Sequence, residues 1–269
     1  MLPDQAESAA ALNSRLLQRY AEALDLDLDR LRDLAARRDL SGLFVPAVSD
    51  SYLCSRVRVM IVGRETAGWG KLRADLAMPG RAASLADYLA HQMAKHRRMV
   101  TQVRGTSKFF QFYRETARQV AAPGGCGMRD APVWANLFCF DDGKTRPDLV
   151  RDDSTADIVR LSGALLRVQV EVLRPALIVF TTGSSCDIYV KQHFGDRIGS
   201  TVHVPKRLWE FRLPLPDDPA GLAGPAQAMA FRTPHPRHAA SAGARRAIVA
   251  EALAPGALAA YLASSPVLT

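Results

Sequence analysis

The stretch Val57-Arg-Val-Met-Ile-Val-Gly-Arg-Glu-Thr-Ala-Gly-Trp-Gly70 decides the fold. Its first six residues are apolar and mostly β-branched apart from Arg58, which is typical of a strand buried on both faces. Gly63 ends the strand, and Gly68 and Gly70 permit backbone conformations that a β-carbon resists. A buried strand that runs into a glycine-bearing loop predicts an open α/β sheet, in which ligands bind at the carboxyl ends of the strands.

The loop carries one carboxylate, Glu65, two residues after Gly63. It is not a recognisable phosphate loop, because it contains neither G-x-G-x-x-G nor G-x-x-x-x-G-K-[S/T]. Taken alone, Glu65 is most simply a solvated residue of an ordinary turn between a strand and a helix. The strands downstream change that interpretation.

The composition is that of a globular protein, with 269 residues, 48% hydrophobic and 23% charged. We expect a helical cap over residues 1–50 and one α/β domain over 51–269. The apolar runs are shorter than the roughly 18 residues of a membrane span. The N-terminus lacks a basic region followed by an apolar core, so no signal peptide is expected. These features predict a monomeric protein of the cytoplasm.

The cysteines do not have the spacing of a metal site. None forms a C-x-x-C pair, and the four are Cys54, Cys126, Cys139 and Cys186. In a cytoplasmic chain this pattern favours reduced thiols over disulfides, metal or iron–sulfur ligation. We therefore expect no metal and no cofactor.

The net charge of +8 is unevenly distributed, because residues 1–40 carry 6 basic and 8 acidic side chains. A strongly basic segment lies between His91 and Arg118, with Glu115 as its acidic residue. Its basic side chains are Lys95, Arg97, Arg98, Arg104, Lys108, Arg114 and Arg118, interleaved with Phe109, Phe110, Phe112 and Tyr113. Cations with nearby aromatic rings suit a phosphate backbone and unstacked bases. An amphipathic helix with a solvated basic face would have the same composition.

Three further apolar segments predict strands that alternate with helices, which is the pattern of a parallel sheet. The strands are expected at 132–138, 176–182 and 226–232, and the helices at 6–38, 158–173 and 244–253. Period-two alternation places Trp134, Asn136 and Phe138 on one face of the first of these strands. Residues 199–215 alternate as a hairpin or edge element does, with Trp209 and Phe211 facing inward.

Polar residues follow these strands in a fixed order: Gly-Arg-Glu after the first, Ala-Asn-Leu at the second, Thr-Thr-Gly after the third and Pro-His-Pro after the fourth. His235 lies between two prolines, which stiffen its loop. The ordered set, over residues 57–253, resembles the uracil-DNA glycosylase superfamily. The resemblance implies a three-layer α/β/α sandwich around a four-stranded parallel sheet, with a base flipped out of DNA as its substrate.

The resemblance also implies roles for particular residues. Glu65 would activate water and stabilise the cationic sugar, and His235 would hydrogen-bond the departing base. Asn136 would read the base edge, donating to a carbonyl and accepting from a ring N–H as uracil requires. Trp69 is the first candidate for stacking on the base. The DNA contacts would come from Arg64, Arg97, Arg98, Arg104, Lys108, Arg237 and His238.

Two motifs depart from the best-known family pattern. The first loop reads Gly-Arg-Glu-Thr-Ala-Gly-Trp instead of Gly-Gln-Asp-Pro-Tyr-His, and the last reads His-Pro-Arg-His instead of His-Pro-Ser-Pro. These changes fall on the base pocket and on the loop that enters DNA. The base is therefore uracil or a modified pyrimidine, such as a bulky phage cytosine derivative. The second choice would make the protein a phage-defence enzyme instead of a repair enzyme.

Two other functions fit parts of the sequence. A nucleoside or nucleotide N-glycosidic hydrolase or transferase would use a carboxylate like Glu65 but has no need of the basic, aromatic segment. A non-catalytic DNA-binding module would use that segment while Glu65 and His235 remained structural. Release of free base from nucleotides alone would favour the first, and absence of abasic sites in any DNA would favour the second.

Overall fold

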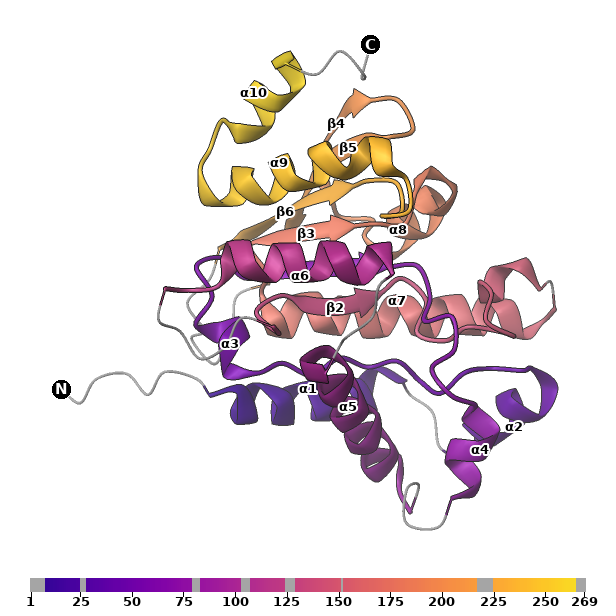
Figure 1. Cartoon of the computed structure of the whole chain (residues 1–269). Helices are drawn as coiled ribbons and strands as arrows, with labels where there is room; N and C mark the ends of the chain where they lie inside the picture. The colour runs from indigo at the N-terminus through magenta and orange to yellow at the C-terminus, as the bar shows by residue number, and fades with distance from the viewer. Residues whose placement is uncertain are drawn as a thin grey trace.

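The computed structural model describes residues 8–24, 28–78, 83–102, 107–123, 129–150, 152–216 and 225–264. These residues form a mixed α/β fold around one sheet (Figure 1), with strand order β2-β1-β3-β6-β5-β4. The strands are β1 (Val59–Gly63), β2 (Val133–Asn136), β3 (Leu177–Phe180), β4 (Ile198–Val204), β5 (Leu208–Pro214) and β6 (Gln227–Arg232).

The four strands expected to be parallel are parallel, in the order β2-β1-β3-β6. The expected sheet size is wrong, because the described sheet has six strands and not four. The predicted hairpin forms β4 and β5, and β5 pairs antiparallel with β6. Without the hairpin, β6 would leave a row of unpaired backbone groups at its edge, and β5 satisfies them. Trp209 and Phe211 are buried as expected.

The helices occupy most of the remaining described chain. The α-helices are α1 (Ala9–Leu24), α2 (Leu28–Arg37), α3 (Asp50–Leu53), α4 (Leu72–Ala77), α5 (Leu85–Gln102), α6 (Lys108–Val120), α7 (Ser154–Leu173), α8 (Asp187–His193), α9 (Ala242–Leu253) and α10 (Ala257–Ser264). Short 3₁₀ helices are η1 (Pro147–Leu149), η2 (Ser184–Cys186) and η3 (Ala239–Ser241). Among these helices, none combines the length and the apolar character that a membrane crossing requires.

Helices cover both faces of the sheet. Successive residues of β1 point to opposite faces, so they pack in two different apolar clusters. Met60 and Val62 belong to an apolar cluster with α1, α2, α5 and α7. Val59 and Ile61 belong to a second cluster with α6, α9 and α10. Figure 1 shows α6 and α9 on the viewer's side of the sheet. The N-terminal helix α1 therefore contributes to the same core as β1.

Candidate functional site

A cavity of about 510 Å³ opens where β1, β2 and β6 end, within the range of ~300–1,000 Å³ common for small-molecule sites. The register explains its position, since Gly63 at the end of β1 pairs with Asn136 at the end of β2. Six residues singled out in the sequence line it: Arg64, Glu65, Lys108, Asn136, His235 and Arg237. The parallel strands thus bring together residues from three distant segments, and Lys108 of α6 adds a fourth.

Glu65 points its carboxylate into a largely buried position, with 10% of the side chain exposed. Its Oε1 lies 3.5 Å from Nη2 of Arg64, and its Oε2 has no hydrogen-bond partner among the described residues. Burial raises the pKa of Glu65, while the positive charges of Arg64 and Arg146 oppose that rise. The result is a carboxylate with one unpaired oxygen and increased basicity, which suits it to hold and deprotonate a water molecule.

Asp141 holds the Glu65 loop in place. Its Oδ2 accepts hydrogen bonds from Thr66 Oγ1 at 2.6 Å and from Gly68 N at 2.8 Å, and its Oδ1 accepts from Lys144 N at 2.9 Å. The loop needs such a constraint, because Gly68 has φ of 116°, where a side chain is strained. Sequence reasoning missed Asp141, although an aspartate in a turn after a strand is a usual loop-anchoring signal.

Replacing Asp141 by alanine is expected to lower the free energy of unfolding by at least about 2 kcal/mol, since its buried carboxylate accepts several hydrogen bonds and each bond to a charged group contributes about 1.5–3 kcal/mol. Urea unfolding followed by circular dichroism measures the change. The matched control is Asp153→Ala, because Asp153 is exposed and its side chain caps no helix. Equal midpoints for the two variants would show that Asp141 does not hold the loop.

Asn136 is the last residue of β2 and is 4% exposed. Its Oδ1 accepts a hydrogen bond from Trp134 Nε1 at 3.0 Å, and its Nδ2 has no partner among the described residues. The two side chains share a face of the strand, as expected. Phe138 does not share it, because β2 ends at Asn136 and Phe138 packs in the opposite apolar cluster. An unpaired buried amide donor in a cavity wall is a group that a ligand can satisfy.

His235 lies in the loop after β6, and its Nδ1 accepts a hydrogen bond from the backbone N–H of Arg237 at 3.2 Å. That bond places the ring proton on Nε2, which remains a donor. Burial, together with the charges of Arg64 and Arg237, lowers the pKa of His235 to about 4. The imidazole is therefore neutral near pH 7. Arg245 braces the loop by donating to the carbonyl oxygens of Pro234 and Pro236.

The first turn of α6 carries a cation and two aromatic rings to the cavity. Ser107 accepts a hydrogen bond from Phe110 N at 3.3 Å and so caps the helix. Lys108, Phe109 and Phe110 all line the cavity. The segment has features of both interpretations drawn from its sequence. Its first turn faces the cavity, as a ligand-binding segment would, whereas Phe112 and Tyr113 are core residues, as in an amphipathic helix. The two half-buried rings are the ones placed to meet a ligand.

Four expected site residues are described by the structure but do not line this cavity. Trp69 is 6% exposed, donates from Nε1 to Gln92 Oε1 at 2.9 Å and packs in the core, so its ring does not face the cavity. Arg97 and Arg98 are exposed on α5 and line a separate depression beside α1. His238 is exposed beyond the loop of His235. Arg104 lies outside the described residues.

The segment 141–150 supplies cavity residues that sequence reasoning missed: Lys144, Thr145, Arg146 and Leu149. Arg146 donates from Nε to Asp148 Oδ1 at 2.9 Å, and Tyr189 donates to Asp148 Oδ2 at 2.8 Å. The guanidinium of Arg146 is thereby fixed in the cavity wall. No motif points to these residues, because their role follows from contacts between distant parts of the chain.

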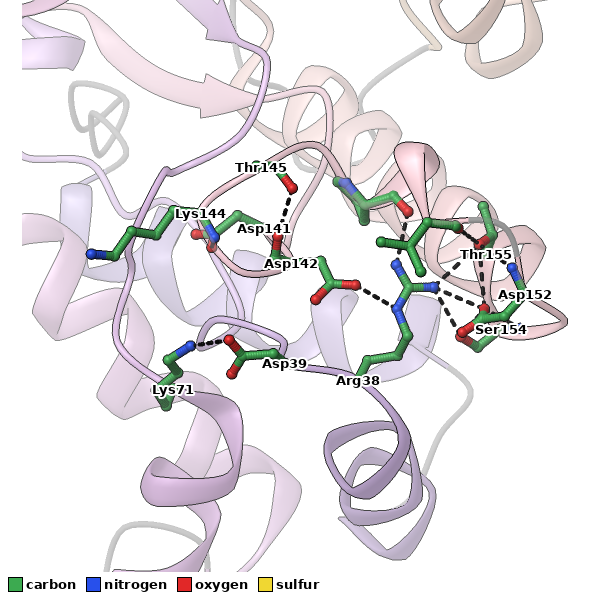
Figure 2. Close-up of polar contacts among 12 residues, drawn as sticks. Arg38, Asp39, Lys71, Asp141, Asp142, Lys144, Thr145, Asp152, Ser154 and Thr155 are labelled. Atoms are coloured by element: carbon green, nitrogen blue, oxygen red, sulfur yellow. Dashed lines mark hydrogen bonds and ion pairs between the residues drawn. The ribbon is translucent and has the colours of Figure 1, made fainter.

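Arg38 also anchors the segment 141–150, and 2% of its side chain is exposed. Its guanidinium donates to Asp142 Oδ2 at 2.6 Å, to Asp152 Oδ1 at 2.8 Å and to the carbonyl oxygen of Pro147 at 2.8 Å. Figure 2 shows Arg38 at the centre of these contacts, with Lys144 on the neighbouring turn. The chain just after α2 therefore holds the wall of the cavity.

Among the described residues, no group of three or more His, Cys, Asp or Glu side chains could hold a metal ion. The chain matches no family model and no curated protein sequence. The assignment of a function therefore rests on the chemistry of the residues that meet in the cavity.

Proposed function

We propose that the protein is a DNA glycosylase that hydrolyses the N-glycosidic bond of a flipped-out pyrimidine and leaves an abasic site. The observation that carries the proposal is the meeting of Glu65, Asn136 and His235 in one cavity at the strand ends. These are the residues to which the resemblance assigns water activation, base reading and support of the departing base. Helices on both faces of the parallel strands support the α/β/α sandwich that the resemblance implies.

The residue types suit the charges that develop in this reaction. As the bond from sugar C1′ to the base nitrogen breaks, the sugar becomes positive and the base takes the electron pair. Glu65 stabilises the positive sugar and accepts a proton from the attacking water, whose oxygen bonds to C1′. His235 donates a hydrogen bond from Nε2 to the negative base, which finally takes up a proton. Neutral imidazole can hold this role near pH 7 without a change of charge.

The cavity rim suits a nucleic acid. Among the described lining residues, five are cationic and one is acidic; the cations are Arg64, Lys108, Lys144, Arg146 and Arg237. Phosphates supply the matching negative charge. Phe109 and Phe110 offer stacking surfaces to a base taken out of the stack. The volume has room for a flipped pyrimidine nucleotide, with either uracil or a modified pyrimidine of phage DNA as its base.

DNA affinity should depend on the cations around the cavity and not on those of α5. Reversing Lys108, Lys144 and Arg237 to glutamate is expected to reduce the slope of log affinity against log salt by about 2–3, since each phosphate contact contributes about 0.7–0.9. Fluorescence anisotropy with a labelled oligonucleotide measures the slope. The control carries Arg97→Glu and Arg98→Glu and should keep the parental slope. A flatter slope in the control alone would place the DNA on α5.

A search for released bases tests the proposed activity. The protein is incubated with DNAs that contain uracil, mismatched, oxidised or phage-type modified bases, and the free bases are identified by mass spectrometry. The proposal expects one class of pyrimidine to be released from DNA. Release from nucleosides or nucleotides alone would assign the cavity to a nucleotide-level hydrolase. If no base is released from any substrate, the remaining interpretation is a non-catalytic DNA-binding module.

A further inference from the structure

We infer that Trp134 sets the base preference by making Asn136 a hydrogen-bond donor only, so that the cavity fits the edge of a cytosine-type base instead of uracil. The inference rests on the proposed function, because it names the substrate class of the same site. It differs from the expectation drawn from the sequence, in which the Asn136 amide both donates and accepts. The difference comes from the position of a neighbouring indole.

The orientation of the Asn136 amide follows from the chemistry of its partner. An indole N–H donates and does not accept, so the amide atom 3.0 Å from Trp134 Nε1 is the oxygen. The same oxygen occupies the space beside Gly63 that a side chain would need, since an added β-carbon would lie 2.5 Å from it. Trp134 and Gly63 therefore enclose the acceptor of Asn136.

The donor of Asn136 is left without a partner. Nδ2 carries two N–H groups, is buried and makes no hydrogen bond to a described residue. An unpaired buried donor is costly, and a ligand acceptor that reaches it removes the cost. Asn136 lines the cavity, so a ligand bound there can supply that acceptor.

The indole is held in place by packing, so the amide cannot reverse at low cost. Rings surround Trp134 with centroid separations of 4.7 to 6.1 Å, from Phe44, Trp69, His96, Phe109 and Phe110. Rotating the Asn136 amide by half a turn would set its N–H groups against the indole N–H. Two opposed donors in a buried site are unfavourable. The packing of Trp134 therefore keeps the Asn136 amide in the orientation in which it donates hydrogen bonds towards the cavity.

A donor whose own amide oxygen is occupied fits an edge position at which the base accepts. N3 of cytosine and of its 5-substituted derivatives is such an acceptor, and one N–H of Nδ2 can donate to it. Uracil and thymine separate their two carbonyl oxygens with an N3–H, which would oppose the donors of Asn136. The geometry therefore favours cytosine-type bases, and Trp134 is the residue that prevents the Asn136 amide from accepting the N3–H.

The test uses Trp134→Phe, which keeps an aromatic ring and removes the N–H. The matched control is Trp69→Phe, because the Trp69 indole also packs on Phe44 but bonds Gln92. Single-turnover release is measured from oligonucleotides that carry one uracil, one cytosine or one 5-hydroxymethylcytosine. Binding of free cytosine and free uracil is measured by calorimetry. Trp134→Phe should shift both ratios towards uracil by about tenfold, the worth of one hydrogen bond, and Trp69→Phe should not.

A second variant covers the case in which Trp134→Phe does not fold. In Asn136→Asp one carboxylate oxygen still accepts from the indole, and the other faces the cavity as an acceptor. This change should also shift both ratios towards uracil. A parent that prefers uracil, or a ratio that neither variant moves, would overturn the inference. If no DNA releases a base while free cytosine still binds more tightly than uracil, the proposed function fails and the base preference stands.

Discussion

Replacing Glu65 by glutamine is expected to reduce base release by about 10²–10⁴-fold, the usual contribution of a positioned general base, while DNA affinity stays at the parental value. Glutamine is nearly isosteric but carries no charge, so it can neither deprotonate water nor stabilise a cationic sugar. The Glu65 carboxylate suits both roles, because its Oε2 makes no hydrogen bond to a described residue. Its ion pair with Arg64 uses the other oxygen, Oε1. Single-turnover release and anisotropy separate the two properties.

The control for this prediction is Glu115→Gln, because Glu115 pairs with Arg246 on the surface and does not line the cavity. That variant should release base at the parental rate. A Glu65→Gln protein with activity within a few-fold of the control would remove Glu65 from the reaction. Loss of DNA binding together with activity would instead show that the loop had changed shape.

Replacing Arg38 by alanine is expected to lower the free energy of unfolding by about 3–5 kcal/mol, because removing one partner of a buried ion pair leaves the other charge uncompensated. Here Asp142 would lose its partner, and the Pro147 carbonyl would lose its donor. Chemical denaturation measures the change. Because the same contacts hold the segment that carries Arg146, base release should fall as well.

The neighbouring Arg37 provides a matched control, since it is exposed at the end of α2. Arg37→Ala should change the free energy of unfolding by no more than about 0.5 kcal/mol, as is usual for surface substitutions. If Arg38→Ala and Arg37→Ala unfold at the same denaturant concentration, the contacts of Arg38 drawn in Figure 2 contribute nothing to stability.

The four parallel strands were predictable because each has a largely apolar pattern that burial explains, but their order in the sheet was not. Val59–Gly63 is buried at every residue, as its composition predicts. The resemblance implied that Glu65, Asn136 and His235 would share one site, which agrees with parallel strands that end at one edge of a sheet. The size of the sheet was not predictable, because alternation in residues 199–215 does not say which strand the hairpin joins.

The supports of the site could not be predicted, because they depend on side chains far apart in the sequence. Asp141 bonds Thr66 across 75 positions, and Arg38 bonds Asp142 across 104. Charge and aromatic patterns also cannot tell a cavity residue from a core or surface residue. Trp69 follows Glu65 closely in the sequence but packs inward, and Arg97 has the same charge as Lys108 but lines a different depression.

The most direct test of the central claim is the stoichiometry of base release and strand damage in one reaction. Free base is counted by mass spectrometry, and abasic sites are counted as alkali-labile breaks in the same DNA. The parent protein should give one abasic site for each pyrimidine released, and Glu65→Gln should give neither above background. DNA that stays free of abasic sites with every base tested, at protein concentrations that saturate binding, would contradict the assignment of glycosylase activity.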